Sequence, residues 1–273
     1  MSRVSLVVSD VDGTLVTTDK ILTESSRAAV GRLDAQGIAF TIVSSRPSFG
    51  LRALSKQLGL RHPMGAYNGG AIVAPDLTVI EQKLIAPETV QKTLEVFYSF
   101  GVDAWIFTVD SWFVKNPHGA YVDHETRTIE TKPTIADRLE DHLDGVTKIV
   151  GVSTEPERLI ACETALRQVI ADAAFIARSQ PYYLDVTPAG VNKGTFVDDL
   201  IGRLGVPTAE VVTIGDMEND VAMFLRSGFS IAMGNAVSDV RKFADAVTRS
   251  NDDGGFADAV EHLILPRAAG TSA

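Results

Sequence analysis

The sequence predicts an α/β protein with a doubly wound (Rossmann-like) parallel-sheet core and an inserted α/β cap domain. Apolar, β-branched runs alternate with helical patterns near both ends of the chain, which is typical of parallel sheets. The segment 84–187 interrupts this alternation with helices and aromatic strands of its own. We therefore expect 1–83 and 188–273 to form the core together, and 84–187 to form the cap.

The core is expected to begin with a strand, a helix and a second strand. Val4 to Val8 has the length and apolar character of a buried strand. Glu24 to Gln36 reads as a helix, because Thr23 suits its N-cap and Gly37 follows its end. Ile38 to Val43 is a second buried strand. This alternation favours parallel strands, and the next expected elements are a helix 47–58, a strand 64–67 and a hairpin of 71–74 with 77–81.

The cap is expected to combine helices with strands, which can form an antiparallel sheet. Its expected helices are 87–100, 134–142 and 156–171, and its strands are 102–109, 112–114, 147–153, 174–177 and 182–186. The polar stretch Asn116 to Thr131 is expected to be irregular, with His118 and His124 as exposed loop residues. Trp105 and Phe107 alternate as strand residues do, which predicts a place in the core of the cap.

The doubly wound pattern resumes at Lys193. The remaining elements are expected to be a helix 194–204, a strand 211–214, a helix ending at 226, a strand 229–233, a short helix 239–243, a last helix 253–265 and a frayed tail 266–273. We find no internal repeat.

Composition excludes several classes of function. The net charge of −10 argues against general nucleic-acid binding, and it means that an anionic substrate needs local cations. The chain has neither an apolar stretch of membrane-spanning length nor a signal-peptide pattern. The lone Cys162 cannot form an internal disulfide and is expected to be buried. We expect a cytoplasmic protein, monomeric or homodimeric, with no nucleic-acid or membrane partner.

Two carboxylates follow the first strand. Residues two apart in an extended chain point the same way, so Asp10 and Asp12 can face one pocket, and Gly13 permits a sharp turn after them. Two crowded acids repel unless a cation or a proton intervenes, so the pair indicates a metal site for an anionic substrate. The alternative is a solvated turn, because Asp-Gly is a common turn dipeptide.

Distant residues favour the metal site. Ser44 follows the second strand, Lys193 opens a helix, and Asp216, Asn219 and Asp220 follow a late strand. Strand ends of a doubly wound sheet share one edge, so these side chains can converge with the first pair. Taken singly, the lysine reads as a solvated first-turn residue and the late acids as helix-start residues.

These residues together resemble the four motifs of the haloacid dehalogenase superfamily. The matching motifs are Asp10–Thr14, Ser44, Lys193-Gly194 and Gly215–Asp220, and two later segments, Met233–Ala236 and Asn251–Gly255, are also similar. The insertion between the second and third motifs resembles the Cof-type (subfamily IIB) phosphatases, which carry a C2-type cap. The resemblance covers nearly the whole chain.

The resemblance implies roles for the motif residues. Asp10 is implied to be the nucleophile, and Asp12 to move a proton to the leaving group and from water. Mg²⁺ is implied to be held by Asp10, by the main-chain carbonyl of Asp12 and by Asp216. Asp220 is implied to orient these groups.

A second group is implied to bind the substrate phosphate. It comprises Ser44, Ser45, Arg46, Lys193 and Asn219. Ser44-Ser45-Arg46 departs from the usual Thr-Gly-Arg: the hydroxyl is kept, but the side chain of Ser45 narrows the site. The alternative for Arg46 is an ion pair with a carboxylate, and Asn68 is either a substrate contact or a turn residue.

The sequence thus predicts a Mg²⁺-dependent phosphatase that acts on small phosphorylated metabolites, sugar phosphates foremost, through an aspartyl-phosphate. Two alternatives remain: a phosphomutase of the phosphomannomutase type, and a signalling receiver module phosphorylated on aspartate. Specificity is expected in cap residues, in 116–131 or 182–187.

Overall fold

A five-stranded parallel sheet forms the centre of the core, as the sequence predicts. The computed structural model describes residues 3–268. The strand order is β14-β13-β12-β1-β2. The strands are β1 (Leu6–Ser9), β2 (Ala39–Ile42), β12 (Val211–Gly215), β13 (Phe229–Ala232) and β14 (Ala246–Val247). Of these, the sequence missed only the two-residue edge strand β14.

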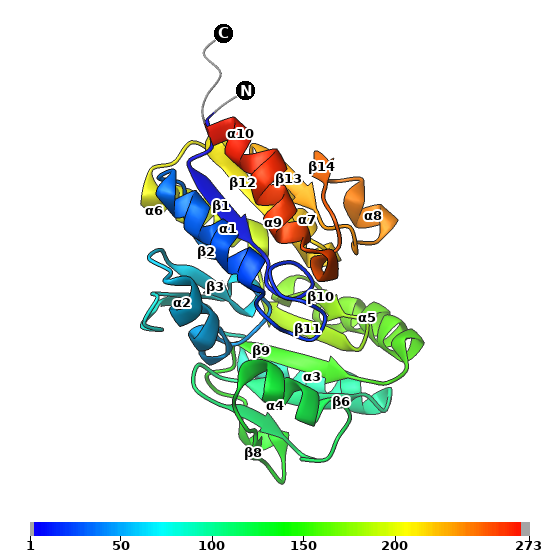
Figure 1. The fold of residues 1–273 in the computed structure, drawn as a ribbon. Coiled ribbons are helices and arrows are strands. Elements are labelled where there is room, and N and C mark those ends of the chain that lie inside the picture. Colours follow the sequence, from blue (N-terminus) through cyan, green and yellow to red (C-terminus); the bar gives the residue numbers. More distant parts are fainter. Residues whose placement is uncertain (1–2, 269–273) are drawn as a thin grey trace.

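Helices cover both faces of this sheet (Figure 1). Val7 packs in the apolar cluster that includes helices α1 and α9, whereas Leu6 and Val8 pack in the cluster that includes α6, α7 and α8. The core helices are α1 (Glu24–Ala35), α2 (Arg52–Leu58), α6 (Lys193–Leu204), α7 (Val221–Phe224), α8 (Ser238–Arg241), α9 (Gly255–Ala259) and α10 (Leu265–Ala268), and a π-helical turn, Val260–Ile264, joins the last two. All four residues of β1 are buried, as a strand covered on both faces requires.

The sequence predicts the first helix boundary well and the last one poorly. Thr23 caps α1 by accepting a hydrogen bond from the Ser26 N–H at 3.1 Å. At the other end of the chain, α10 extends into the segment expected to be a frayed tail, because Pro266 lies in its first turn, where proline is tolerated. Residues 269–273 lie outside the described part.

A small antiparallel sheet follows α2. It consists of β3 (Met64–Ala66), β4 (Ala71–Val73) and β5 (Val79–Gln82). The parallel pattern predicted up to β3 continues only as a bridge between Val43 and Gly65. The chain reverses at the turn η2 (Tyr67–Gly69), where Tyr67 and Asn68 have left-handed backbone angles, so β3 pairs antiparallel with β4.

The cap is built on a six-stranded sheet of order β10-β11-β9-β6-β7-β8. All its strand pairs are antiparallel except β7 with β8. The strands are β6 (Asp103–Phe107), β7 (Trp112–Val114), β8 (Thr134–Ile135), β9 (Lys148–Val152), β10 (Ala174–Gln180) and β11 (Tyr183–Pro188). Helices α3 (Pro87–Ser99) and α5 (Pro156–Ile170) pack on one of its faces (Figure 1).

Two expectations for the cap are wrong. The stretch expected to be irregular contains helix α4 (Val122–Ile129), and the helix expected over 134–142 is replaced by β8 and a short 3-10 turn. Val122, Glu125 and Ile129 are buried at helical spacing, yet Tyr121 and Glu130 end α4 with left-handed backbone instead of glycine. Polar composition and the lack of a glycine or proline at either cap position therefore hid this helix.

Two apolar clusters show how the cap packs against the core. One lies inside the cap, between its sheet and helices α3 and α5, and contains Cys162, which is buried as predicted. The other is shared by the core and the opposite face of the cap sheet. Trp105 and Phe107 are buried, but they belong to this shared cluster and face the core. The cap is therefore closed onto the core.

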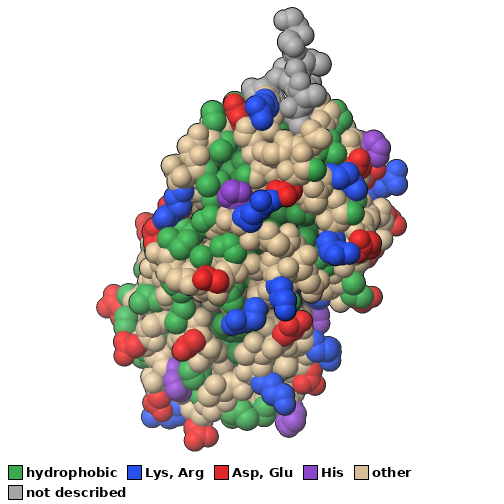
Figure 2. Space-filling view, turned by 60° about the vertical axis from the view of Figure 1, so that its left-hand side comes forward, with side chains coloured by type: hydrophobic (Ala, Val, Ile, Leu, Met, Phe, Trp, Pro, Cys, Tyr) green, Lys and Arg blue, Asp and Glu red, His purple; other side chains and the backbone are tan. Residues whose placement is uncertain are grey.

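The surface carries charges of both signs. Basic and acidic side chains are interspersed over the face drawn in Figure 2, so the net charge of −10 forms no field of a single sign there. Within residues 3–268, every helix is too short or too polar to cross a membrane.

Candidate active site

The carboxyl edge of the parallel sheet gathers the acidic residues that the sequence singles out. β1 ends at Ser9 and β12 at Gly215, and the Asp10 N–H donates to the Ile214 carbonyl at 2.9 Å. This main-chain bond places Asp10 beside the loop that begins with Asp216. Both residues are buried, with exposed fractions of 4% and 6%.

The turn after Asp12 approaches Asp216 very closely. Gly13 has a φ of +86°, and a Cβ atom there would lie 2.4 Å from Oδ2 of Asp216. Only glycine fits this turn. Next to it, the Thr14 hydroxyl donates to Asp216 Oδ1 at 2.8 Å, and the Asn235 amide donates to Asp216 Oδ2 at 3.2 Å.

Sequence reasoning missed Thr14 and Asn235 as site residues. Thr14 lies inside the first motif, but its hydroxyl was given no partner. Asn235 follows β13, so the rule that strand ends share an edge applies to it as well.

Lys193 links two of the carboxylates. Asn192 caps α6 by accepting from the Thr195 N–H at 3.0 Å, and the helix therefore starts with Lys193 pointing inward. Its Nζ lies 2.5 Å from Oδ1 of Asp10 and 2.6 Å from Oδ1 of Asp220. The lysine is only 1% exposed, so the reading as a solvated first-turn lysine is wrong.

Asp220 is bonded through both of its oxygens. Oδ1 faces Lys193, and Oδ2 accepts from the N–H groups of Asp216 and Met217, each at 2.8 Å. The carboxylate thereby holds the loop that presents Asp216 and fixes the position of the lysine.

Crowding of buried carboxylates raises two pKa values. Burial raises the pKa of Asp10 to about 6, with the charges of Asp220 and Asp12 adding to the rise and Lys193 opposing it. Burial, followed by the charges of Asp10 and Asp220, raises the pKa of Asp216 well above its ordinary 3.8. Ligand oxygens of Asp10, Asp216 and Asp220 lie within 4.8 Å of one another. The site offers many oxygen ligands, and its three carboxylates share a single lysine, so it fits a divalent cation.

Asp12 has a different environment. Arg46 donates to its two oxygens from Nε and Nη2, both at 2.8 Å, and Lys20 Nζ lies 3.0 Å from Oδ1. Burial opposes ionisation, but these two cations outweigh it and hold the pKa of Asp12 well below its usual range. Arg46, expected among the phosphate ligands, is therefore paired with a carboxylate here, and Lys20 is a cation that sequence reasoning missed.

The loop after β2 carries the two serines. Ser44 is fully buried, and its Oγ accepts from the Arg46 N–H at 3.1 Å. The Ser45 carbonyl accepts from Nζ of Lys148, a cap residue on β9, at 2.9 Å. A direct contact thus runs from the cap to this loop.

Asn219 lies next to Asn68. Its Nδ2 donates to Asn68 Oδ1 at 2.9 Å, and Asn68 Nδ2 donates to Asp185 of β11 at 3.3 Å. Among the described residues, Asn219 Oδ1 has no hydrogen-bond partner although it is buried.

A narrow polar pocket lies between the cap and the core, beside Asp12. Its volume is about 20 Å³. The core side includes Asp12 and Arg46, and the cap side includes His124, Lys148 and Tyr182. The expectation that His124 is an exposed loop residue is therefore wrong, because it lies on α4 and lines the pocket. Both cap stretches expected to set specificity reach this pocket.

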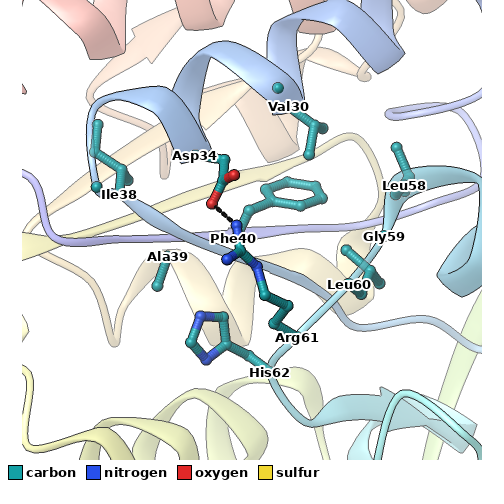
Figure 3. Close-up of a pocket in the computed structure, with 12 residues that line it drawn as sticks. Val30, Asp34, Ile38, Ala39, Phe40, Leu58, Gly59, Leu60, Arg61 and His62 are labelled. Carbon is teal, nitrogen blue, oxygen red and sulfur yellow. Dashed lines mark hydrogen bonds and ion pairs between the residues drawn. The ribbon is translucent and has the colours of Figure 1, made fainter.

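A larger cavity lies at the opposite edge of the sheet. Its volume is about 380 Å³, and it lies near the start of β2, between the ends of α1 and α2 (Figure 3). Its walls are largely apolar, and its single carboxylate, Asp34, is paired with Arg61. The cavity is remote from the carboxyl ends of the strands, where the acidic residues lie, so it is not part of the candidate site.

Comparison with known proteins identifies the class. The family model for haloacid dehalogenase-like hydrolases matches residues 7–260, so the chain belongs to that family. It is 30% identical over 267 residues to a Streptococcus pyogenes protein provisionally named a phosphatase, covering 96% of this chain and 99% of that one. A Bacillus subtilis 5-amino-6-(5-phospho-D-ribitylamino)uracil phosphatase is 26% identical, covering 96% of each chain.

Solved structures place the fold in the same family. A haloacid dehalogenase-like hydrolase from Bacteroides thetaiotaomicron superimposes with a TM-score of 0.83 and 28% identity, over 95% of this chain and 99% of that one. Within the family the chain is a Cof-type phosphatase, a hydrolase of phosphate esters. Because the chain belongs to this family of hydrolases, it is not a signalling receiver module.

Proposed function

We propose that this phosphatase is Mg²⁺-dependent and hydrolyses small phosphorylated metabolites, sugar phosphates foremost, through an aspartyl-phosphate on Asp10. The observation that carries the proposal is the contact of Lys193 with both Asp10 and Asp220, beside Asp216. In this proposal 1–83 and 188–273 form the catalytic core, and 84–187 forms its C2-type cap.

In the first step, a carboxylate oxygen of Asp10 attacks the phosphorus and the bond to the leaving oxygen breaks. The leaving oxygen takes the proton of Asp12. Asp12 must therefore be protonated when substrate is bound, whereas Arg46 and Lys20 favour its ionised form here. A phosphate dianion competes with Asp12 for the guanidinium of Arg46. When Arg46 turns from Asp12 to the phosphate, the pKa of Asp12 rises.

In the second step, Asp12 removes a proton from water, the water oxygen attacks the phosphorus and the bond to Asp10 breaks. Inorganic phosphate leaves and the Asp10 carboxylate is restored. The different neighbours of the two aspartates support this division, because similar burial yields opposite pKa shifts.

Ser44 and Lys193 would hold the substrate phosphate. Both are buried at the carboxyl edge, and each carries a donor suited to an anionic oxygen. Ser45, Arg46 and Asn219 complete the proposed phosphate-binding group. The two cations of this group, Lys193 and Arg46, offset the repulsion that a net charge of −10 imposes on an anion.

The carboxylates of Asp10 and Asp216, with the main-chain carbonyl of Asp12, would hold Mg²⁺. Asp220 is a poorer ligand, because both of its oxygens are already hydrogen-bonded. The bound ion supplies charge neutralisation on the transferring phosphoryl group. Thr14 and Asn235 hold the Asp216 carboxylate in place for that role.

The polar lining of the pocket beside Asp12 supports a small hydrophilic leaving group. His124 and the Tyr182 hydroxyl offer hydrogen bonds, and the closed cap excludes bulk water and macromolecules. The alternative within the same chemistry is a phosphomutase, which returns the phosphate to a sugar. Release of phosphate without an added sugar acceptor would count against it.

The test is a phosphate-release screen with Mg²⁺ and with a chelator. The panel contains sugar phosphates, nucleotides, cofactor phosphates and 5-amino-6-(5-phospho-D-ribitylamino)uracil, the substrate named for a relative. We expect turnover that depends on Mg²⁺ and a loss of at least about a thousandfold in Asp10→Asn, because that variant lacks the nucleophile.

A matched control is Asp19→Asn, which alters an exposed carboxylate in the same loop and should leave turnover unchanged. Activity that survives chelation, or full activity in Asp10→Asn, would overturn the mechanism. Co-crystals grown with fluoroberyllate should show density bonded to Asp10, whereas density bonded to Asp12 would reverse the two roles.

A further inference from the structure

A buried ion pair of the cap faces the phosphate-binding loop. Lys148 on β9 and Asp185 on β11 lie on neighbouring strands, with Nζ 3.0 Å from Oδ2. Their side chains are 6% and 1% exposed. Burying two charges carries a large desolvation cost, so the pair is weak evidence of a purely stabilising role.

The pair completes the hydrogen bonding of the loop after β2. The carbonyls of Ser44 and Arg46 accept from main-chain N–H groups of the η2 turn, at 2.8 and 2.9 Å. The carbonyl between them, that of Ser45, accepts from Lys148 Nζ at 2.9 Å. The core therefore holds the first and third carbonyls of this set, and the cap holds the one between them.

The contact with Ser45 reaches the hydroxyl of Ser44 through one peptide unit. The Ser45 carbonyl and the Arg46 N–H belong to the same planar peptide, so fixing one fixes the direction of the other. That N–H donates to Ser44 Oγ at 3.1 Å. The hydroxyl oxygen is thus occupied as an acceptor, and its proton is left to donate to a phosphate oxygen.

Asp185 holds the ammonium of Lys148 in place through the ion pair. Its Oδ2 also accepts from Asn68 Nδ2 at 3.3 Å, and Asn68 belongs to the same η2 turn that holds the loop. The contacts therefore form a ring that runs from the loop to the turn, to Asp185, to Lys148 and back to the loop. Half of this ring belongs to the cap.

We propose that Lys148, held by Asp185, is a positioning residue that orients the Ser44 hydroxyl toward the substrate phosphate when the cap closes. The inference rests on the proposed function, because it assigns a phosphate-binding role to Ser44. It makes closure of the cap a condition for a complete phosphate site.

The test is a double-mutant cycle on kcat/KM and on inhibition by inorganic phosphate. Lys148→Met should lower kcat/KM about ten- to hundredfold, because small displacements of a binding group are costly in catalysis. In a Ser44→Ala background, the same substitution should change kcat/KM by less than about twofold, because residues that act through one group are not additive. Lys148→Met should also weaken inhibition by phosphate.

Two further variants control for the loss of a lysine as such and for misfolding. Lys92→Met removes an exposed lysine from α3 and should leave kcat/KM unchanged. Lys148→Met leaves Asp185 buried without its counter-charge, so Lys148→Met with Asp185→Asn removes both charges if the single variant fails to fold.

The outcomes separate the two proposals. A wild-type protein that releases no phosphate from the panel overturns the proposed function, and this inference falls with it. With an active wild-type protein, full activity of Lys148→Met overturns the inference alone. A loss that is undiminished in the Ser44→Ala background does so as well, because it shows that the lysine acts independently of Ser44.

Discussion

Asp10 and Asp12 are two residues apart and both buried, yet their neighbours push their pKa values in opposite directions. Burial and the nearby Asp220 raise the pKa of Asp10, while Arg46 and Lys20 outweigh burial at Asp12. Motif spacing predicted that the two would share a pocket. It could not reveal Lys20, because which cation meets a carboxylate depends on how a loop folds back.

Gly13→Ala should damage the site by placing a Cβ against Asp216. The new atom would lie 2.4 Å from Oδ2 in a residue whose φ is +86°. Left-handed backbone alone costs alanine about 1 kcal/mol, whereas displacement of Asp216 should lower kcat/KM at least about a hundredfold and raise the Mg²⁺ concentration required. Phosphate release titrated with Mg²⁺ measures both effects.

Gly37→Ala is the matched control for this substitution. Its φ is +70° and nothing lies within 4 Å of the new Cβ, so it imposes similar backbone strain without the clash. Its unfolding free energy should fall by about 1 kcal/mol while its activity is kept. Equal activity losses in the two variants would contradict the steric account.

Glu125→Gln should become more stabilising as pH rises. Burial raises the pKa of Glu125 above its ordinary 4.5, with the charge of Asp12 adding to the rise and Lys148 opposing it. The folded state then binds the proton more tightly than the unfolded state, so this group lowers wild-type stability as pH rises above 4.5. Glutamine does not titrate, and it can still accept the hydrogen bond from the Tyr183 hydroxyl.

The measurement is the unfolding free energy of both proteins by denaturant titration between about pH 5 and pH 8. The difference between variant and wild type should shift steadily in favour of the variant. A difference that stays constant over this range would show that Glu125 titrates alike in both states.

At the scale of elements, sequence reasoning was most accurate where a local signal marks a boundary. Helix α1 follows from its Thr23 cap, and β1 and β12 follow from apolar runs that lead into acidic loops. It failed for α4, whose polar sequence lacks such signals. Contacts with the core hold this helix in place. Ile129 lies against Gly50, and the Thr128 carbonyl accepts from Arg46 at 3.0 Å.

Gly50→Val should separate α4 from the core. Gly50 lies in the 3-10 turn Ser48–Leu51, and a Cβ there would lie 3.0 Å from Cγ2 of Ile129. The larger side chain should cost about 1–3 kcal/mol of stability and, by moving α4, lower kcat/KM about tenfold. Thermal unfolding and steady-state kinetics measure the two effects.

For comparison, Gly31→Val adds the same side chain to α1 at a position with nothing within 4 Å of the new Cβ. It should leave kcat/KM as in the wild type. If Gly50→Val also keeps full activity, then the position of α4 does not matter for catalysis.

For the whole molecule, the insertion of a cap was visible in the sequence because the strand-and-motif pattern stops and later resumes. The closure of the cap was not visible. It depends on one face of the cap sheet meeting the core across a long sequence separation, and an aromatic residue such as Trp105 reads the same on either face. Only the packed arrangement assigns it to the shared cluster.

Trp105→Ala and Leu159→Ala should separate stability from activity. Both residues are buried, but Trp105 belongs to the cluster shared by cap and core, and Leu159 to the cluster inside the cap. Each substitution should cost about 2–5 kcal/mol. Below its unfolding temperature, Leu159→Ala should retain kcat/KM within about threefold, whereas Trp105→Ala should lose more than about tenfold, because only it disturbs closure.

Unfolding curves and kinetics at one low temperature provide both quantities. Parallel losses of activity in the two variants would mean that the cap responds as a single unit, whichever of its clusters is damaged.

The pocket beside Asp12, at about 20 Å³, has room for roughly one water molecule. A crystal that fixes this arrangement would shut substrate analogues out, whatever their affinity in solution. Soaking such crystals would then return maps without the analogue, and a screen that docks compounds into this shape would discard true substrates for their size. Co-crystallisation, which lets the cap close around its ligand, is the experiment suited to this enzyme.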